Sequence, residues 1–283
     1  MPFTKLQFRP GINRETTSYT NEGGWFDCDK IRFRYGVPEK IGGWYKVSGN
    51  TFQGTCRGLK PWVALDGTQF MGVGTNLKYY IEEGGSLNDI TPIRLTTSAG
   101  DVTFAATNGS DVITATETGH GAIQGDFVTF SDAASLGGAI TAPVLNQEYE
   151  ITDIVNANSY KFTATATANG SDTGNGGGAS VAAYQINVGL DTSVSGTGWG
   201  AGTWGRGTWG SASSLLAAGA TLRLWSHDNF GEDLLINVRD GGIFYWDRSD
   251  SASSFVRAVA LSDESSDAKT PTIAKQILVS DVD

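Results

Sequence analysis

The sequence predicts an all-β fold, and three features carry that prediction. Glycine is abundant, with 38 in 283 residues, and Ser, Thr, Asn and Asp are also frequent. Because glycine supplies positive φ angles and short polar side chains cap turns, this composition indicates many short strands joined by tight turns. Apolar and polar residues alternate in several short segments, and no segment shows the 3.6-residue period of a helix. Eight Trp, nine Tyr and thirteen Phe supply enough apolar surface for a core.

Residues 1–60 are predicted to form an extended basic N-terminal arm, with ten Lys or Arg against five acids. Residues 30–35 alternate strictly, which predicts a strand with Ile31, Phe33 and Tyr35 on one face and cations on the other. The basic face is either a solvated strand face or a docking surface for an acidic neighbour or DNA phosphates. The candidate assembly residues in the arm are Arg9, Arg14, Lys30, Arg32 and Arg34.

Residues 61–94 and 186–283 together are predicted to form a propeller-like domain. Each range contains an aromatic strand, a short apolar strand, a tight turn and further strands, and Asp66-Gly67 is a strong hairpin signal. In the first range, Gly84-Gly85 predicts a turn that is followed by a last strand at 90–93. Repeats of roughly 40 residues with four strands suggest propeller blades, although a generic β-sandwich accounts for the pattern equally well. Residues 273–283 resemble the opening of another strand pair, which more chain or another chain is expected to complete.

Residues 95–185 are predicted to form a separate small β-barrel inserted between the two blade-like segments. Lys161 is the one basic residue there, against nine acids. Strand-like segments occur at 112–114, 127–130, 149–151 and 160–163, separated by turn signals such as Asn108-Gly109.

Residues 196–210 are a Gly-Trp repeat in which Trp199, Trp204 and Trp209 stand five residues apart. Such a segment has no core of its own, so the rings must pack on something. They either cover the edges of the host domain or form an inter-subunit or receptor contact, since Trp is enriched in interface hot spots. All three are candidate assembly residues.

The formal net charge is −10, and beyond residue 60 the chain carries ten cations against twenty-five acids. Such a body repels nucleic acid, which disfavours a DNA-binding role for the whole protein. The N-terminus lacks the apolar region of a secretory signal, so we expect synthesis in the cytoplasm. Two cysteines do not make a disulfide framework, and free thiols are expected.

The sequence offers no credible active site, so we predict a protein that is not an enzyme and that uses no cofactor and no metal. His120 and His227 both lie in turn-like contexts, and neither has a partner at zinc-site spacing. There is no nucleophile elbow and no phosphate-binding glycine loop.

Several segments resemble one family. Residues 9–15, 21–34 and 38–44 look like the start of a tail protein of short-tailed bacteriophages, and residues 196–210 and 277–283 resemble the same family. Residues 101–165 are similar to a small β-barrel module of phage tail proteins. The family is the tail nozzle, also called tail tubular protein B-like or tail hub. The resemblance implies a β-propeller with inserted domains, six copies of which ring the DNA channel below the adaptor and portal.

The predicted function is therefore that of a structural virion protein, located in the viral tail, forming a nozzle around the DNA ejection channel. Expected partners are further copies of itself, the tail adaptor, tail fibre proteins, viral DNA passing without specific binding, and the host cell surface. The alternative is a receptor- or carbohydrate-binding tail protein that uses the Trp-rich segment. A further rival, a propeller glycosidase, needs two suitably spaced carboxylates.

Overall fold

The computed structural model describes residues 8–17, 19–43, 45–46, 49–190, 222–251, 254–265 and 269–280, and it confirms the predicted all-β class. Within these ranges the helices are two single turns, α1 (Ala142–Leu145) and α2 (Leu261–Glu264). The chain divides into two compact units, Met1–Gly49 and Asn50–Asp283. The predicted arm at 1–60 therefore differs from the structure at its end, because strand β3 (Cys56–Val63) belongs to the second unit.

The first unit contains an antiparallel hairpin of β1 (Ile31–Arg34) and β2 (Val37–Lys40). Tyr35 and Gly36 form its two-residue turn, with φ angles of 52° and 81°. The prediction that Tyr35 shares a strand face with Ile31 and Phe33 is wrong, because the chain reverses one residue earlier. The Tyr35 side chain is 93% exposed. Phe33 instead packs near the Trp25 ring, with centroids 6.4 Å apart.

The second unit contains two four-stranded antiparallel meanders, each with its strands in sequence order. In the first, Gly84 and Gly85 both have positive φ and place the fourth strand directly after the third. The fourth strand therefore lies at 86–89 instead of the predicted 90–93. The first meander consists of β3, β4 (Gln69–Thr75), β5 (Tyr79–Glu83) and β6 (Ser86–Asp89), and the second of β15 (Trp225–Phe230), β16 (Asp233–Val238), β17 (Ile243–Trp246) and β18 (Val259–Ala260).

The two meanders share one aromatic core. Trp62 and Phe70 from the first meander meet Trp246 from the second edge-on, at centroid distances of 6.3 and 6.2 Å. Phe255 stacks on Trp246 at 5.7 Å. Edge-to-face and offset ring pairs are the favoured geometries of aromatic packing. Four-stranded meanders packed on a common core are the form that propeller blades take.

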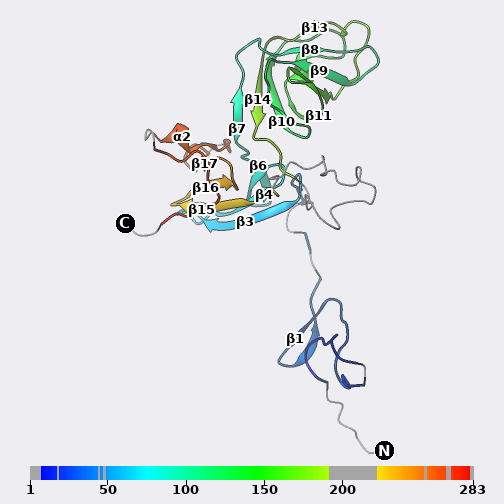
Figure 1. Cartoon of the computed structure of the whole chain (residues 1–283), viewed down its shortest axis with the longest axis vertical. Coiled ribbons are helices and arrows are strands. Elements are labelled where there is room, and N and C mark those ends of the chain that lie inside the picture. The colour runs from blue at the N-terminus through cyan, green and yellow to red at the C-terminus, as the bar shows by residue number, and fades with distance from the viewer. Residues whose placement is uncertain are drawn as a thin grey trace, which may run out of the picture. The chain divides into compact units, whose positions relative to one another are not determined.

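Between the meanders the chain forms an eight-stranded sheet of order β13-β8-β9-β12-β11-β10-β14-β7, which curls around its own core (Figure 1). Phe104 packs edge-on against Phe130 at 4.9 Å inside it. The four strand-like segments noted in the sequence lie in β9, β10, β11 and β12. The strands are β7 (Ile93–Thr96), β8 (Thr103–Ala105), β9 (Val112–Thr116), β10 (Phe127–Ala133), β11 (Glu148–Asn156), β12 (Ser159–Thr163), β13 (Asn175–Gly176) and β14 (Gly178–Gln185).

A buried ion network joins this curled sheet to both meanders. Lys78, which is almost fully buried, pairs with Asp89 at 2.9 Å and also with Glu148 of β11. Arg257 pairs with the same two carboxylates, at 3.1 Å and 3.0 Å. Although burial opposes ionisation of Asp89, the charges of Arg257 and Lys78 hold its pKa below the ordinary value. The four charges balance, which is the condition for keeping ions away from water.

Removing one member of this network is predicted to destabilise the second unit. Lys78→Met leaves two partly buried carboxylates with one cation, and we expect a loss of about 3 kcal/mol in the free energy of unfolding. Urea denaturation followed by tryptophan fluorescence measures it. The matched control is Lys161→Met, whose pair with Asp153 is exposed and whose loss is expected to cost under about 1 kcal/mol. Equal effects of the two substitutions would contradict the assignment.

The carboxyl group of Glu117 is buried inside the curled sheet. Glu117 accepts a hydrogen bond from the hydroxyl of Tyr184, which lies 2.7 Å from the hydroxyl of Tyr160. Burial raises the pKa of Glu117 above its ordinary value of 4.5, and the Tyr184 hydrogen bond offsets only part of that. Both tyrosine rings are inaccessible to solvent, so this cluster contributes to the core and not to a surface site.

The raised pKa of Glu117 makes a pH dependence of stability testable. A carboxyl group whose pKa is higher in the folded state contributes stability below its ordinary pKa, and that contribution is lost as pH rises through the raised value. The melting temperature of the wild type relative to Glu117→Gln should therefore fall as the pH rises above 4.5 and through the raised pKa. Glu150→Gln, on the exposed side of β11, is the control. A pH-independent difference between wild type and Glu117→Gln would disprove the expectation.

Candidate functional site

Three of the five predicted basic residues are already paired inside the first unit. Arg14 lies 2.5 Å from Asp27, Lys30 lies 3.7 Å from Asp29, and Arg32 lies 3.1 Å from Glu39. All six side chains are largely exposed, so these pairs contribute little to stability. They do, however, neutralise much of the positive charge that the sequence assigns to this segment.

The other two, Arg9 and Arg34, have no ion pair within the described residues. The backbone N–H of Arg9 donates to the carbonyl of Gly23 at 2.7 Å. Arg34 is the last residue of β1, and its guanidinium group lies 5.6 Å from the centre of the Tyr35 ring. The candidate tryptophans Trp199, Trp204 and Trp209 lie outside the described residues.

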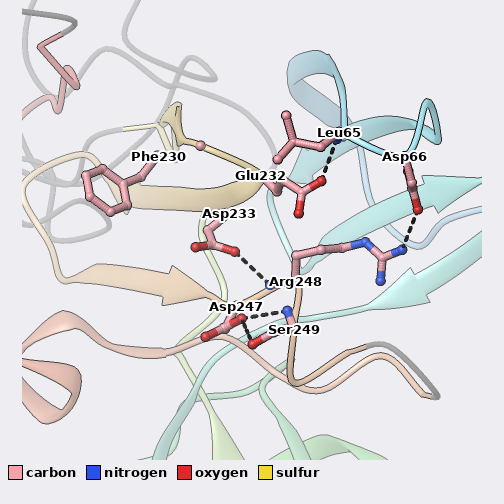
Figure 2. A pocket seen from close by; sticks show the side chains of 9 residues that line it. Leu65, Asp66, Phe230, Glu232, Asp233, Asp247, Arg248 and Ser249 are labelled. Carbon is pink, nitrogen blue, oxygen red and sulfur yellow. Dashed lines mark hydrogen bonds and ion pairs between the residues drawn. The ribbon is translucent and has the colours of Figure 1, made fainter.

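A hollow of about 780 Å³ lies at one end of the paired meanders, where their turns meet. Figure 2 shows its lining, which combines two apolar side chains with several acidic ones. Leu65, beside the β3–β4 turn, is 94% exposed, and Phe230, at the end of β15, is 60% exposed. The lining residues are Leu65, Asp66, Phe230, Gly231, Glu232, Asp233, Asp247, Arg248 and Ser249.

Glu232 and Asp233 are held in place by hydrogen bonds, of which the Glu232 bond joins the two meanders and the Asp233 bonds lie within the second. A carboxylate oxygen of Glu232 accepts from the backbone N–H of Leu65 at 2.5 Å, which joins the turn of one meander to the turn of the other. Asp233 accepts from the hydroxyl of Tyr245 at 2.5 Å and from the backbone N–H of Arg248 at 2.9 Å. These bonds fix both carboxylates at the floor of the hollow.

The rim of the hollow carries a net negative charge. The backbone and hydroxyl of Thr68 hold the pKa of Asp66 below its ordinary value, and the hydroxyl and backbone of Ser249 do the same for Asp247. Both groups are therefore ionised at neutral pH. Arg248 is the one cation in the lining; it lies 3.5 Å from Asp66 and stacks over the Phe70 ring at 5.2 Å.

This arrangement suits binding better than acid–base chemistry. A general acid needs a raised pKa, whereas the two rim carboxylates with shifted values are both lowered. Across the described ranges, no group of three His, Cys, Asp or Glu side chains is placed to hold a metal ion. The open, partly apolar hollow with ionised carboxylates fits a cationic side chain attached to an apolar or aromatic group.

The two histidines lie elsewhere. His120 accepts the backbone N–H of Ala122 at 3.1 Å inside the curled sheet, and its imidazole is buried. His227 does not lie in a turn, as the sequence suggested, but in strand β15. Its Nδ1 is 2.9 Å from the Tyr79 hydroxyl, and burial lowers its pKa. The turn-like residues Asp228-Asn229 extend the strand because β15 pairs with β16 along its whole length.

Sequence reasoning recognised Asp66-Gly67 as a turn but assigned no site to it. The other lining residues stand about 165 to 180 positions later in the chain, and only packing of the meanders brings them together. The signal that was available is the exposed apolar residue beside each turn, Leu65 before Asp66 and Phe230 before Gly231.

Comparison with known proteins gives little. No family model matches the chain, and no curated protein matches it. Among solved structures, the endosialidase of phage phi92 aligns with 81% of this chain at 13% sequence identity and a TM-score of 0.26. This chain spans about a third of that one. The similarity is too low to carry an argument about fold or activity. Neither helix in the described part of the chain is long and apolar enough to span a membrane.

The cation in the lining is expected to contribute to stability through its aromatic contact. Arg248→Met removes the stacking on Phe70 and should lower the free energy of unfolding by about 1 kcal/mol. Chemical denaturation provides the measurement. Arg239→Met is the matched control, because Arg239 is exposed and the bond assigned to it uses only its backbone. A loss in the control as large as that in the variant would show that the effect is not specific to the stacked site.

Proposed function

We propose that this chain is a structural protein of the tail of a short-tailed bacteriophage, and specifically a nozzle that surrounds the DNA ejection channel. In this role the protein assembles with copies of itself, with the tail adaptor above and with tail fibre proteins, and it is located in the virion. In this proposal the chain carries out no reaction and has a purely structural role in the tail.

The observation that carries the proposal is the pairing of the two meanders. Two four-stranded antiparallel sheets, far apart in sequence, share one aromatic core, and a curled eight-stranded sheet is inserted between them. The resemblance of residues 9–15, 21–34 and 38–44 to nozzle proteins implies a propeller with inserted domains. Two meanders with a sheet inserted between them agree with such a propeller, and this agreement supports the proposal.

Charge adds a second line of support. Beyond residue 60 the chain carries twenty-five acids against ten cations. A channel wall of this sign does not bind phosphates tightly, because each DNA phosphate is itself negative. Viral DNA would slide past such a wall without sticking, which is what a conduit requires.

The test is to find the chain in purified virions. Mass spectrometry should detect it as a stoichiometric virion protein, and cryo-electron microscopy should place about six copies around the tail axis, the symmetry that the family resemblance implies. A peripheral position, as fibre or tip, would overturn the nozzle proposal. Binding to a glycan array that disappears in a Trp199, Trp204 and Trp209 to Ala variant would then favour the receptor-binding alternative.

A further inference from the structure

The tip of the β1–β2 hairpin displays groups that the fold of its own unit does not use. Tyr35 is 93% exposed and has a φ of 52°, a region in which a bulky side chain is strained by about 1 kcal/mol or more. Asn, Asp or Gly is preferred at this position of such a turn. The Arg34 guanidinium lies 5.6 Å from the Tyr35 ring, and Val37 is also exposed. A strained, exposed Tyr beside an Arg has the composition of an interface hot spot.

Arg34 differs from Arg32 and Arg14 of the same unit. Arg32, two residues earlier on the same strand, is paired with Glu39 across the hairpin, and Arg14 is paired with Asp27. Within the described residues, Arg34 has a ring contact but no carboxylate. The tip therefore presents one cation, one aromatic ring and one aliphatic side chain together.

The hollow in the second unit has the complementary chemistry. Leu65 and Phe230 expose apolar surface beside Asp66, Glu232 and Asp247 (Figure 2). Four carboxylates in the lining face one guanidinium group, so the hollow attracts a cation. Its volume of about 780 Å³ accommodates an aromatic ring and a guanidinium group at once.

We propose that the Arg34–Tyr35 hairpin tip of one copy docks in the hollow of a second copy. The occupant is a second copy because the chain itself carries both halves of the charge complement: the first unit, residues 1–49, has eight cations against five acids, and the remainder has twelve cations against twenty-five acids. Each copy then offers a tip to one neighbour and a hollow to another, a head-to-tail contact that generates rings or chains.

In the docked arrangement the Tyr35 ring packs between Leu65 and Phe230, and the Arg34 guanidinium group meets the rim carboxylates. Burying the ring supplies the hydrophobic contribution, and the charges set the orientation and the rate of encounter. The proposal deepens the nozzle function, because it names the contact between copies, but it is tested on the purified chain alone.

The first experiment is site-specific photo-crosslinking. Tyr35 is replaced by benzoylphenylalanine, which keeps an aromatic ring at the tip, and the protein is mixed with an equal amount of ¹⁵N-labelled wild-type chain. Mass spectrometry should find peptide pairs that join position 35 to the segments around Leu65 or Phe230, with the two peptides carrying different isotopes. Cross-links confined to one chain, or to other surfaces, would overturn the proposal.

The second experiment uses variants that keep the hairpin intact. Tyr35→Asn removes the ring while supplying a residue that the turn prefers, so it should not unfold the unit. Together with Arg34→Glu it should weaken self-association, measured by analytical ultracentrifugation, by at least about tenfold, the effect of losing about 1.4 kcal/mol at an interface. Arg32→Gln, on the same strand but paired with Glu39, is the matched control and should leave association unchanged.

A mixing experiment distinguishes contact between copies from contact within one chain. An Arg34→Glu chain and a Phe230→Glu chain should each associate more weakly alone than the wild type. When they are mixed, the intact tip of one meets the intact hollow of the other, and dimers should form. If mixing restores nothing, the contact is not between copies and the proposal fails.

The proposed contact and the proposed nozzle function can fail independently of each other. A chain that is present at the tail axis but gives no cross-link from tip to hollow would retain the function and lose the contact. Cross-links between purified copies of a chain that is absent from virions would retain the contact and lose the function.

Discussion

The structure of the second unit depends on the need to balance the buried charge of Lys78 and the three partly buried charges around it. Lys78 and Arg257 each contact both Asp89 and Glu148. Lys78 and Asp89 belong to the first meander, Arg257 to the segment before β18, and Glu148 to the curled sheet. Because an unpaired ion is costly to bury, none of these three parts is free to move away from the others without exposing the network to water. The network thereby fixes the inserted sheet on the meander pair, although these residues lie up to 179 positions apart in sequence.

The aromatic core gives the meander pair its second constraint, and the hollow is its consequence. Trp62 and Phe70 lie just before and just after the β3–β4 turn, and Trp246 closes β17. When these rings pack together, the turns at their ends are brought into contact, and Glu232 bonds to the backbone of Leu65. The indole N–H of Trp62 also donates to the carbonyl of Glu232, at 3.2 Å. The acidic, partly apolar hollow therefore follows from how the core packs, and any substitution that loosens the core should also reshape the hollow.

Unequal distribution of charge along the chain links the fold to assembly. In the first unit, Arg14, Lys30 and Arg32 form exposed pairs with acids of the same unit, whereas the hairpin tip carries Arg34 beside a strained tyrosine. The second unit concentrates ionised carboxylates around exposed Leu65 and Phe230. In the proposed contact, attraction would act between the hairpin tip and the hollow, and charge complementarity of this kind sets specificity more than affinity.

The sequence by itself determined the all-β class, the similar strand order of the two meanders and the four strands that became β9, β10, β11 and β12, because alternation and turn residues act over a few positions. It misplaced Tyr35 and the strand now at 86–89, since in each case a two-residue turn with positive φ reversed the chain earlier than the apolar pattern suggested. Only the tertiary structure decided which cations are neutralised, which rings share a core and which carboxylates surround the hollow. The shared core and the hollow depend on contacts between residues more than a hundred positions apart, and no local pattern in the sequence records such contacts.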